Sequence, residues 1–137
     1  MIRICNSMQL IEADRGLRFD VEIGGRATTG FVLRWRGDAV GFLNQCAHVA
    51  MELDWMPGEF LDSGREFIIC ATHGAIYDPA SGRCLGGPCQ GRAGLRRIAV
   101  VERDGAVWWA PDGAVRAPTD PPPGSARQTP PASTPVE

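Results

Sequence analysis

The 137-residue sequence contains no lysine, only two histidines and only one tyrosine. All fourteen basic residues are arginines, which we attribute to a bias of genome composition, and the formal net charge is -2. Because a nucleic-acid-binding protein usually shows a net positive charge gathered in a basic stripe, we expect no nucleic acid among the partners. Any chemistry that needs an imidazole must use His48 and His73.

Long apolar runs are also missing. No hydrophobic segment approaches the roughly 20 residues that a membrane-spanning helix needs, and the first residues do not follow the basic-then-apolar order of a secretory signal. We therefore expect a soluble, cytoplasmic protein that does not associate with a membrane. In a reducing compartment, cysteines near histidines are more often metal ligands than disulfide partners.

No segment combines an apolar period of 3.6 residues with helix-capping residues, so the sequence predicts an all-β fold. Apolar and polar residues alternate in residues 17–23, and a strand there should turn at Gly24-Gly25 into a second strand at 28–36. Further strands are expected at residues 8–11, 39–44, 66–70, 95–102 and 106–110. The last two should form a hairpin that pairs with the first strands.

The chain divides into a folded domain and a tail. The domain is expected at residues 1–110, with a base sheet made of its first and last strands and an inserted part at about residues 45–92. Eight of the eleven prolines fall in residues 111–137, which contain almost nothing apolar to bury. This composition predicts a disordered or extended tail.

Two short pairs, Cys46-Ala-His48 and Cys70-Ala-Thr-His73, contain every histidine. A tight loop can aim both members of such a pair inward. Two facing loops would enclose a metal centre. Zinc accepts two thiolates and two imidazoles, yet its modules usually group like ligands, so a structural zinc module is the less favoured alternative. The interleaved order suits a two-iron cluster in which each loop gives Cys to one iron and His to the other.

These residues resemble the Rieske family of [2Fe-2S] proteins. The resemblance covers about residues 42–95 and includes both ligand pairs, Tyr77-Asp78, Ser81-Gly82 and the Gly87-Pro88 loop. It implies a Rieske-like antiparallel β-sandwich with an inserted cluster-binding subdomain. It also implies a [2Fe-2S] cluster as cofactor.

By this resemblance, Cys46 and Cys70 bind one iron, and His48 and His73 bind the other. The turn that ends at Pro88 closes over the cluster as a third loop. The interval between the two ligand pairs is longer than is usual in the family. We interpret the extra residues as a longer hairpin that leaves the ligands usable.

By the resemblance, this chain differs from the high-potential respiratory members of the family at three positions. Those members have two hydroxyl donors to sulfur, of which this chain keeps Tyr77 but has Ala75 in place of the other, and they have a disulfide between the loops where this chain has Met51 and Thr72. Both differences resemble the lower-potential ferredoxins. We therefore expect a midpoint potential in the lower half of the class range of about -150 to +300 mV. Tyr77 either directs its hydroxyl at sulfur or packs as an ordinary strand residue.

The resemblance implies a non-enzymatic electron carrier. It would pass single electrons from a reductase to an oxygenase or another redox enzyme. Terminal oxygenases of this superfamily hold a second iron on two histidines and a carboxylate, and no histidines remain here to build that site. The alternative is a non-catalytic, cluster-bearing small subunit or redox sensor of a larger oxidoreductase.

Three cysteines remain outside the expected ligand set. Cys5, near the N-terminus, is interpreted as incidental. Cys84 and Cys89 flank the third loop and could form a bridge, although a reducing compartment argues against a permanent one. The sequence leaves their pairing open.

Overall fold

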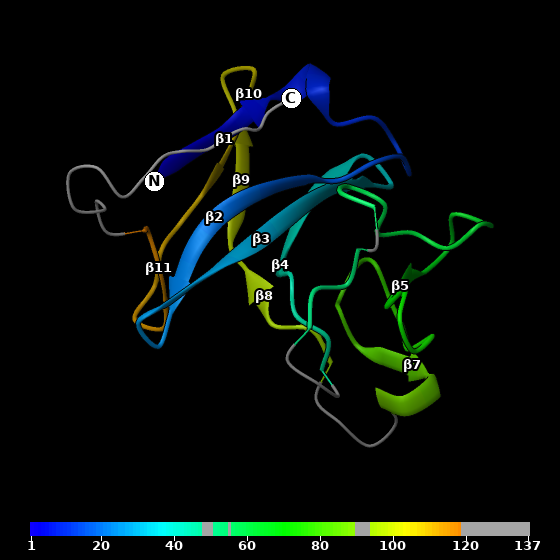
Figure 1. Ribbon diagram of the computed structural model, residues 1–137. Coiled ribbons are helices and arrows are strands. Elements are labelled where there is room, and N and C mark those ends of the chain that lie inside the picture. Colours follow the sequence, from blue (N-terminus) through cyan, green and yellow to red (C-terminus); the bar gives the residue numbers. More distant parts are fainter. Residues whose placement is uncertain (48–50, 55, 90–93, 119–137) are drawn as a thin grey trace.

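Antiparallel strands make up nearly all the regular structure of the computed structural model, which describes residues 1–47, 51–54, 56–89 and 94–118 (Figure 1). The largest sheet has the order β11-β2-β3-β4-β8, with bounds Val115–Arg116, Leu17–Ile23, Arg26–Trp35, Asp38–Leu43 and Arg97–Ile98. The second, β1-β10-β9, contains Ile2–Asn6, Ala106–Trp109 and Val100–Arg103. The third, β5-β6-β7, contains Ile68–Ile69, Ile76–Tyr77 and Cys84–Gly86. The helices of the described residues are two short 3-10 turns, η1 (Ser7–Gln9) and η2 (Gly87–Cys89).

The meander β2-β3-β4 is the centre of the fold. β2 pairs with β3 along its whole length, from Leu17 opposite Val32 to Ile23 opposite Arg26. β3 buries side chains on both faces, because Phe31 lies in one hydrophobic core and Val32 in another. A strand covered on both sides requires apolar residues at successive positions, as β3 has.

The sheet β1-β10-β9 covers one face of this meander. Trp109 of β10 packs against Phe19 of β2 with ring centroids 5.3 Å apart, and Val107 shares a core with Val32. The opposite face is covered by the part of the chain that connects β4 to β8. The expected antiparallel β-sandwich is confirmed, and it is built around a central strand with cores on both sides.

The inserted part begins after β4 and ends before β8, and these two strands are neighbours in the large sheet. Gly41 pairs with Ile98 and Phe42 with Arg97, so both ends of the insertion start from adjacent positions. Figure 1 shows β5 and β7 of this insertion set apart from the strands β1 to β4. The ring of Phe60 stacks on that of Phe31 at 3.8 Å, which attaches the insertion to the sheet.

The N-terminal strand differs from the sequence prediction. A strand was expected at residues 8–11, but β1 spans Ile2–Asn6 and pairs with β10, and the chain then turns through η1. The Asn6 amide donates a hydrogen bond to Gln9 at 2.7 Å, which supports the turn. Cys5 is consequently a buried core residue and not an incidental one, and burial raises the pKa of its thiol.

Residues 111–118 contribute to the domain as well. Val115 and Arg116 pair with Ile23 and Glu22 of β2, and Val115 is buried against Trp109. The folded part therefore continues at least through β11. Residues 119–137 lie outside the described residues, and a disordered tail there stays a prediction.

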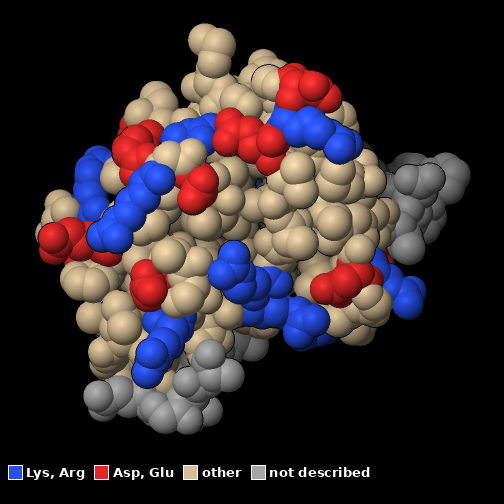
Figure 2. All heavy atoms as spheres, turned by 180° about the vertical axis from the view of Figure 1, so that it is seen from behind, with Lys and Arg blue, Asp and Glu red and all other residues tan. Residues whose placement is uncertain are grey.

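Charged side chains of both signs are interspersed on the face drawn in Figure 2. Arg15 pairs with Glu59 at 2.8 Å and Arg65 with Asp14 at 3.2 Å. Exposed pairs of this kind contribute little to stability. None of the helices among the described residues has the length and apolarity needed to span a membrane.

Arg34 of β3 connects several segments through its guanidinium group. It donates two hydrogen bonds to the carboxylate of Glu102 on β9, at 2.7 and 2.9 Å. It also donates to the carbonyls of Leu10 at 2.8 Å, and of Ser7 and Gly37 at 3.1 Å each. The hydrogen bonds from Arg34 lower the pKa of Glu102 from 4.5 to about 2, and Ser7 adds to this effect.

Substitution of Glu102 should therefore change how stability depends on pH. The folded-state pKa is lowered, so the stabilisation is complete above pH 4.5 and disappears as pH falls towards about 2. Near neutral pH we expect Glu102→Gln to have a lower melting temperature than the native protein. As the pH falls from 4.5 towards about 2, the two melting temperatures should converge. Circular dichroism checks this, with the exposed Glu66→Gln as control. If the two melting temperatures differed equally at neutral and at acidic pH, the charge of Glu102 would not be the cause of the stabilisation.

Candidate metal centre

The second ligand pair lies in a tight loop, residues 70–75, between β5 and β6. The Cys70 amide donates to the carbonyl of Ala75 at 2.9 Å, and the Gly74 amide donates to the carbonyl of Cys70 at 2.8 Å. This closed turn directs Cys70 into the core, where it is fully buried. His73 is exposed at the outer end of the same loop.

The first ligand pair follows β4. The Cys46 amide donates to the carbonyl of Met51 at 2.8 Å, and this hydrogen bond joins the two ends of the segment that contains the pair. Cys46 is buried, with 3% of its surface exposed. His48 lies outside the described residues, so its expected place at the site stays a prediction.

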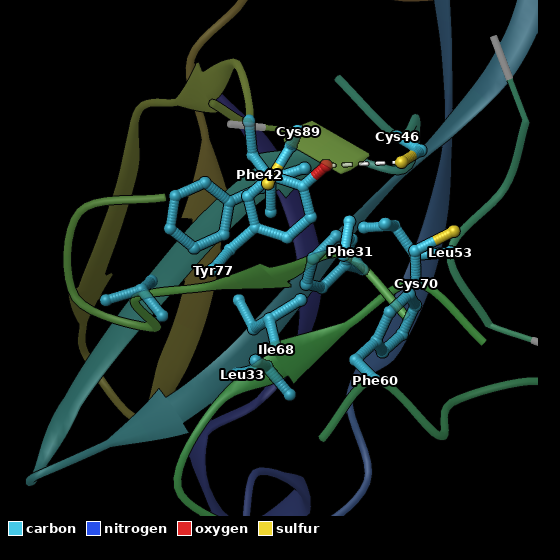
Figure 3. Close-up of a cluster of buried hydrophobic side chains, with 13 residues drawn as sticks. Phe31, Leu33, Phe42, Cys46, Leu53, Phe60, Ile68, Cys70, Tyr77 and Cys89 are labelled. Carbon is cyan, nitrogen blue, oxygen red and sulfur yellow. Dashed lines mark hydrogen bonds between the residues drawn. The ribbon is translucent and has the colours of Figure 1, made fainter. Parts of the chain in front are cut away.

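The hydroxyl of Tyr77 lies between the two loops, above the core drawn in Figure 3. It accepts a hydrogen bond from the Ala47 amide at 3.0 Å and lies 3.1 Å from the Cys46 sulfur. Between the two neutral groups either atom can be the donor, but a Cys46 thiolate has no proton, so the Tyr77 hydroxyl would then donate to the sulfur. Burial raises the pKa of Tyr77, which keeps the phenol protonated and able to donate.

The sulfur of Cys70 is surrounded by donors as well. The amides of Thr72 and His73 donate to it, and the Cys46 thiol lies within hydrogen-bonding reach. Burial is the largest influence and raises the pKa of Cys70, while the two amides oppose this increase. A metal cation would displace the protons of both thiols, because cysteine binds metals as thiolate. Two adjacent buried thiols with donors aimed at sulfur fit an iron–sulfur centre.

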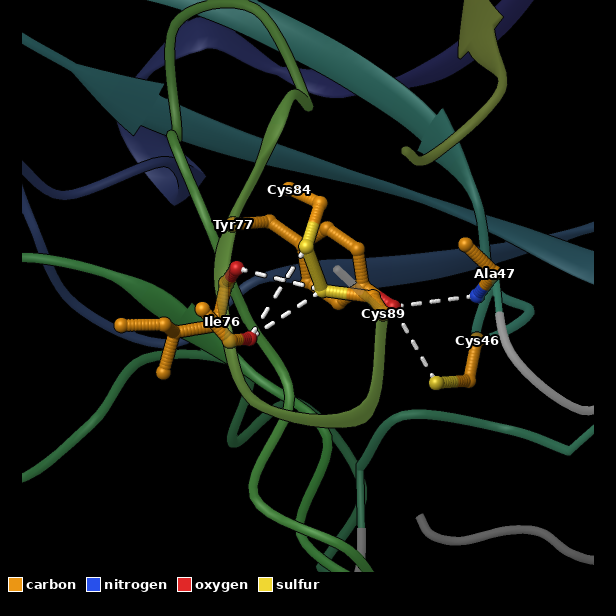
Figure 4. The surroundings of a disulfide bond; sticks show 7 residues. Cys46, Ala47, Ile76, Tyr77, Cys84 and Cys89 are labelled. Carbon is orange, nitrogen blue, oxygen red and sulfur yellow. Dashed lines mark hydrogen bonds between the residues drawn. A yellow bond between two sulfur atoms is a disulfide. The ribbon is translucent and has the colours of Figure 1, made fainter. Parts of the chain in front are cut away.

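The third loop, η2 and the residues around it, packs against the second. Gly87 has a φ of +81°, and a Cβ atom there would lie 2.9 Å from the Gly74 carbonyl oxygen and 3.0 Å from the Ala75 Cα. Only glycine allows so close an approach in this conformation. Pro88 follows at the surface. The disulfide Cys84–Cys89, which the sequence left open, closes this loop (Figure 4).

The structure thus brings together some of the expected site residues. Cys46, Cys70 and Tyr77 lie in one core, with the third loop against the second ligand loop. Within the described ranges, no three His, Cys, Asp or Glu side chains are grouped so that they could hold a metal ion. The assignment of His48 and His73 to a second iron stays a prediction.

Comparison with known families identifies the domain. The profile of the Rieske [2Fe-2S] domain family matches residues 1–102. The chain belongs to this family. The cofactor of a Rieske domain is a [2Fe-2S] cluster, so the alternative of a structural zinc module is not supported. No match is found among curated protein sequences.

Solved structures share the Rieske fold with this chain. The ferredoxin of carbazole 1,9a-dioxygenase from Nocardioides aromaticivorans has 22% identity and a TM-score of 0.60, with 81% of this chain and 97% of that chain covered. A ferredoxin seen in complex with the oxygenase of carbazole 1,9a-dioxygenase has 19% identity and a TM-score of 0.58, with 80% and 100% covered. The terminal oxygenase from N. aromaticivorans has 21% identity and a TM-score of 0.61, but only 34% of that chain is covered, against 90% of this one.

A buried polar pair that the sequence analysis missed closes the first loop of this Rieske domain at its base. The Asn44 amide group donates to the Asp54 carboxylate at 3.0 Å, and its oxygen accepts from the Leu53 amide at 2.9 Å. Asp54 also accepts from the Gly58 amide at 3.0 Å, and Arg18 lies 3.8 Å from its side chain, which is fully buried. The sequence carried only a weak signal, because Asn44 follows an apolar strand and Asp54 follows Leu53, ten positions apart, with other polar residues between them.

Removal of this pair should loosen the first ligand loop. Asn44→Ala leaves the Leu53 amide and one oxygen of the Asp54 carboxylate without their buried partner, which costs about 1–3 kcal/mol for each group. We expect a lower midpoint of chemical denaturation and faster loss of bound iron to a chelator. Gln45→Ala, at the next position, is the control and should change neither. Normal iron retention in Asn44→Ala would show that the pair does not hold the loop.

Proposed function

We propose that this Rieske domain carries single electrons from a reductase to a terminal oxygenase or another redox enzyme. The observation that carries the proposal is the position of the ligand loops. Cys46 and Cys70 are buried together beneath them, while His73 is exposed at the outer end of its loop. A centre held in this way has one side insulated by the core and the other near the surface, where a partner can exchange electrons.

Cys46 and Cys70 would hold one iron, and His48 and His73 the other. When bound, the cluster accepts and releases one electron, at a potential raised by its neutral imidazole ligands. The amides of Thr72 and His73 stabilise negative charge on the Cys70 sulfur, and the Tyr77 hydroxyl does so on the Cys46 sulfur. Pro88 and its loop would limit water at the site.

The fold similarity to two ferredoxins supports a carrier. This chain covers nearly all of the two ferredoxins and about a third of the oxygenase. One of those ferredoxins forms a complex with its oxygenase, and a partner of that type is proposed here. The 137 residues hold no further histidine for a mononuclear iron site.

A second candidate is a redox sensor or a non-catalytic, cluster-bearing small subunit of a larger oxidoreductase. The disulfide beside the ligand loops favours the sensor version, because a thiol pair responds to the redox state of its surroundings. The two candidates differ in kinetics. Rapid reduction by a reductase without a tight complex supports the carrier, whereas a stable stoichiometric complex supports the subunit.

Substitution of the proposed ligands tests the site. We expect the native protein to hold two irons with acid-labile sulfide, and to give a low-temperature electron paramagnetic resonance signal when reduced. Alanine at any one of Cys46, His48, Cys70 or His73 should abolish that signal. Cys5→Ser, in the distant β1, should leave it unchanged. A native protein free of iron and sulfide would contradict the proposed function.

Tyr77→Phe tests the hydroxyl donor. Loss of a hydrogen bond of about 1 kcal/mol from the reduced state lowers a one-electron midpoint potential by roughly 40 mV. The native midpoint is expected in the lower half of the class range of about -150 to +300 mV. Potentiometric titration measures the midpoint potentials of the native protein and of Tyr77→Phe. Trp108→Phe on β10 is the control, and its midpoint potential should equal the native one. An unchanged potential in Tyr77→Phe would mean that the hydroxyl serves only the Ala47 amide.

A further inference from the structure

The disulfide Cys84–Cys89 encloses the turn of the third loop. Cys84 is half-buried at the start of β7, and Cys89 is fully buried at the end of η2, five positions later in the chain. The two sulfur atoms therefore differ in access to solvent. A thiol reagent can approach Cys84, whereas Cys89 lies in the core that also contains Tyr77.

The surroundings of the two sulfur atoms suit the reduced state as well as the oxidised one. The Cys89 sulfur lies 3.2 Å from the carbonyl oxygen of Gly86 and 3.7 Å from that of Ile76, and the Cys84 sulfur lies 3.8 Å from that of Gly86. A disulfide has no proton to donate to these oxygens. After reduction, each thiol gains a proton and finds an acceptor already in place. Because two thiol sulfurs cannot remain at bonding distance, reduction must shift the loop, while each thiol still has an acceptor at hand.

Two contacts connect this disulfide with the ligand loops. Cys84 lies opposite Tyr77 in the pairing of β6 with β7, and the hydroxyl of Tyr77 contacts the Cys46 sulfur. Figure 4 shows the Tyr77 ring beside the disulfide, with its hydroxyl directed at Cys46. Gly87, inside the disulfide loop, lies against Gly74 of the second ligand loop. A change in the loop conformation would reach the site through both contacts.

We propose that Cys84 and Cys89 form a second redox site, a reversible dithiol–disulfide pair whose state shifts the potential of the metal centre through Tyr77. The reductant is a thiol of the glutathione class. The effect on the metal centre rests on the proposed function, whereas the thiol chemistry does not.

The exchange begins at the accessible sulfur. A reductant thiolate attacks the Cys84 sulfur, the bond between Cys84 and Cys89 breaks, and Cys89 leaves as a thiolate that takes up a proton. A second reductant thiol then attacks the mixed disulfide and releases Cys84, which is protonated in turn. Two electrons and two protons reach the protein, and two reductant thiols become one disulfide.

The first experiment measures the thiol chemistry in the full chain with its cluster. The protein is equilibrated in buffers that range from oxidised to reduced glutathione, alkylated and analysed by mass spectrometry. We expect Cys84 and Cys89 to gain the alkyl group together in one reversible transition, while Cys5 provides the reference for a buried thiol. The proposal would be overturned if Cys84 and Cys89 remained free thiols in oxidised buffer, or if their disulfide were never reduced in reduced buffer.

The second experiment measures the effect on the metal centre. The double variant Cys84→Ser/Cys89→Ser should have a lower midpoint potential than the disulfide-bonded native protein, by no more than the shift caused by Tyr77→Phe. In the Tyr77→Phe background, the double substitution should cause no further shift. An unchanged potential, or a shift that persists in that background, would contradict the link through Tyr77.

The two proposals fail in different ways. A native protein that binds no cluster would contradict the electron-carrier function, yet its thiol–disulfide transition can still be measured by alkylation. A protein with a normal cluster and a Cys84–Cys89 disulfide that cannot be reduced would contradict this inference alone.

Discussion

The hydroxyl of Tyr77 is the contact on which the geometry of the site depends. It joins the Ala47 amide of the first loop and the Cys46 sulfur to a strand that leads directly out of the second loop. A buried hydroxyl, amide and thiol would each be costly without a partner, and this arrangement satisfies all three. A further bond, from the Ala71 amide to the Leu53 carbonyl at 3.0 Å, ties the loops at a second point. These hydrogen bonds join the two loops, and the residues at positions 51 and 72, Met and Thr, cannot form a disulfide between them.

The hydrogen bonds between the loops set the geometry of the site, but the apolar core supplies most of the free energy that stabilises the fold. The rings of Phe31, Phe42 and Phe60 pack together where the insertion meets the large sheet, and removal of one such ring typically costs about 3–5 kcal/mol. The Asn44–Asp54 pair lies beside this core and closes the base of the first loop. The insertion is therefore rigid where it leaves the sheet and exposed at the loops that carry the ligands. An accessible end on a well-packed base suits the proposed exchange of electrons with a partner.

The sequence predicted the parts of the fold that have local signals. Alternation in residues 17–23 and paired glycines at 24–25 gave β2 and its turn almost without error. The two Cys-His pairs pointed to Cys46 and Cys70, which the fold buries in one core, while the ligand assignment stays a prediction. β1 was missed because its burial is decided by β10, more than a hundred positions away in the chain, and by an irregular register at Cys5. The Asn44–Asp54 pair was missed for a similar reason: a polar residue in an apolar stretch does not reveal its partner. The choice between the two interpretations of Tyr77 also required the fold, because it depends on Ala47 and Cys46 from another loop.

The position of the disulfide distinguishes this domain from one in which a disulfide bridges the two ligand loops. A bridge between the two ligand loops constrains the ligands themselves, so its reduction would loosen the metal site. Cys84–Cys89 instead lies within the third loop, and the closing hydrogen bonds of both ligand loops are made by other residues. A change in thiol state can then alter the hydrogen bond from Tyr77 to Cys46 while the proposed ligands stay in place. A two-electron thiol reaction would in this way adjust a one-electron carrier without dismantling it.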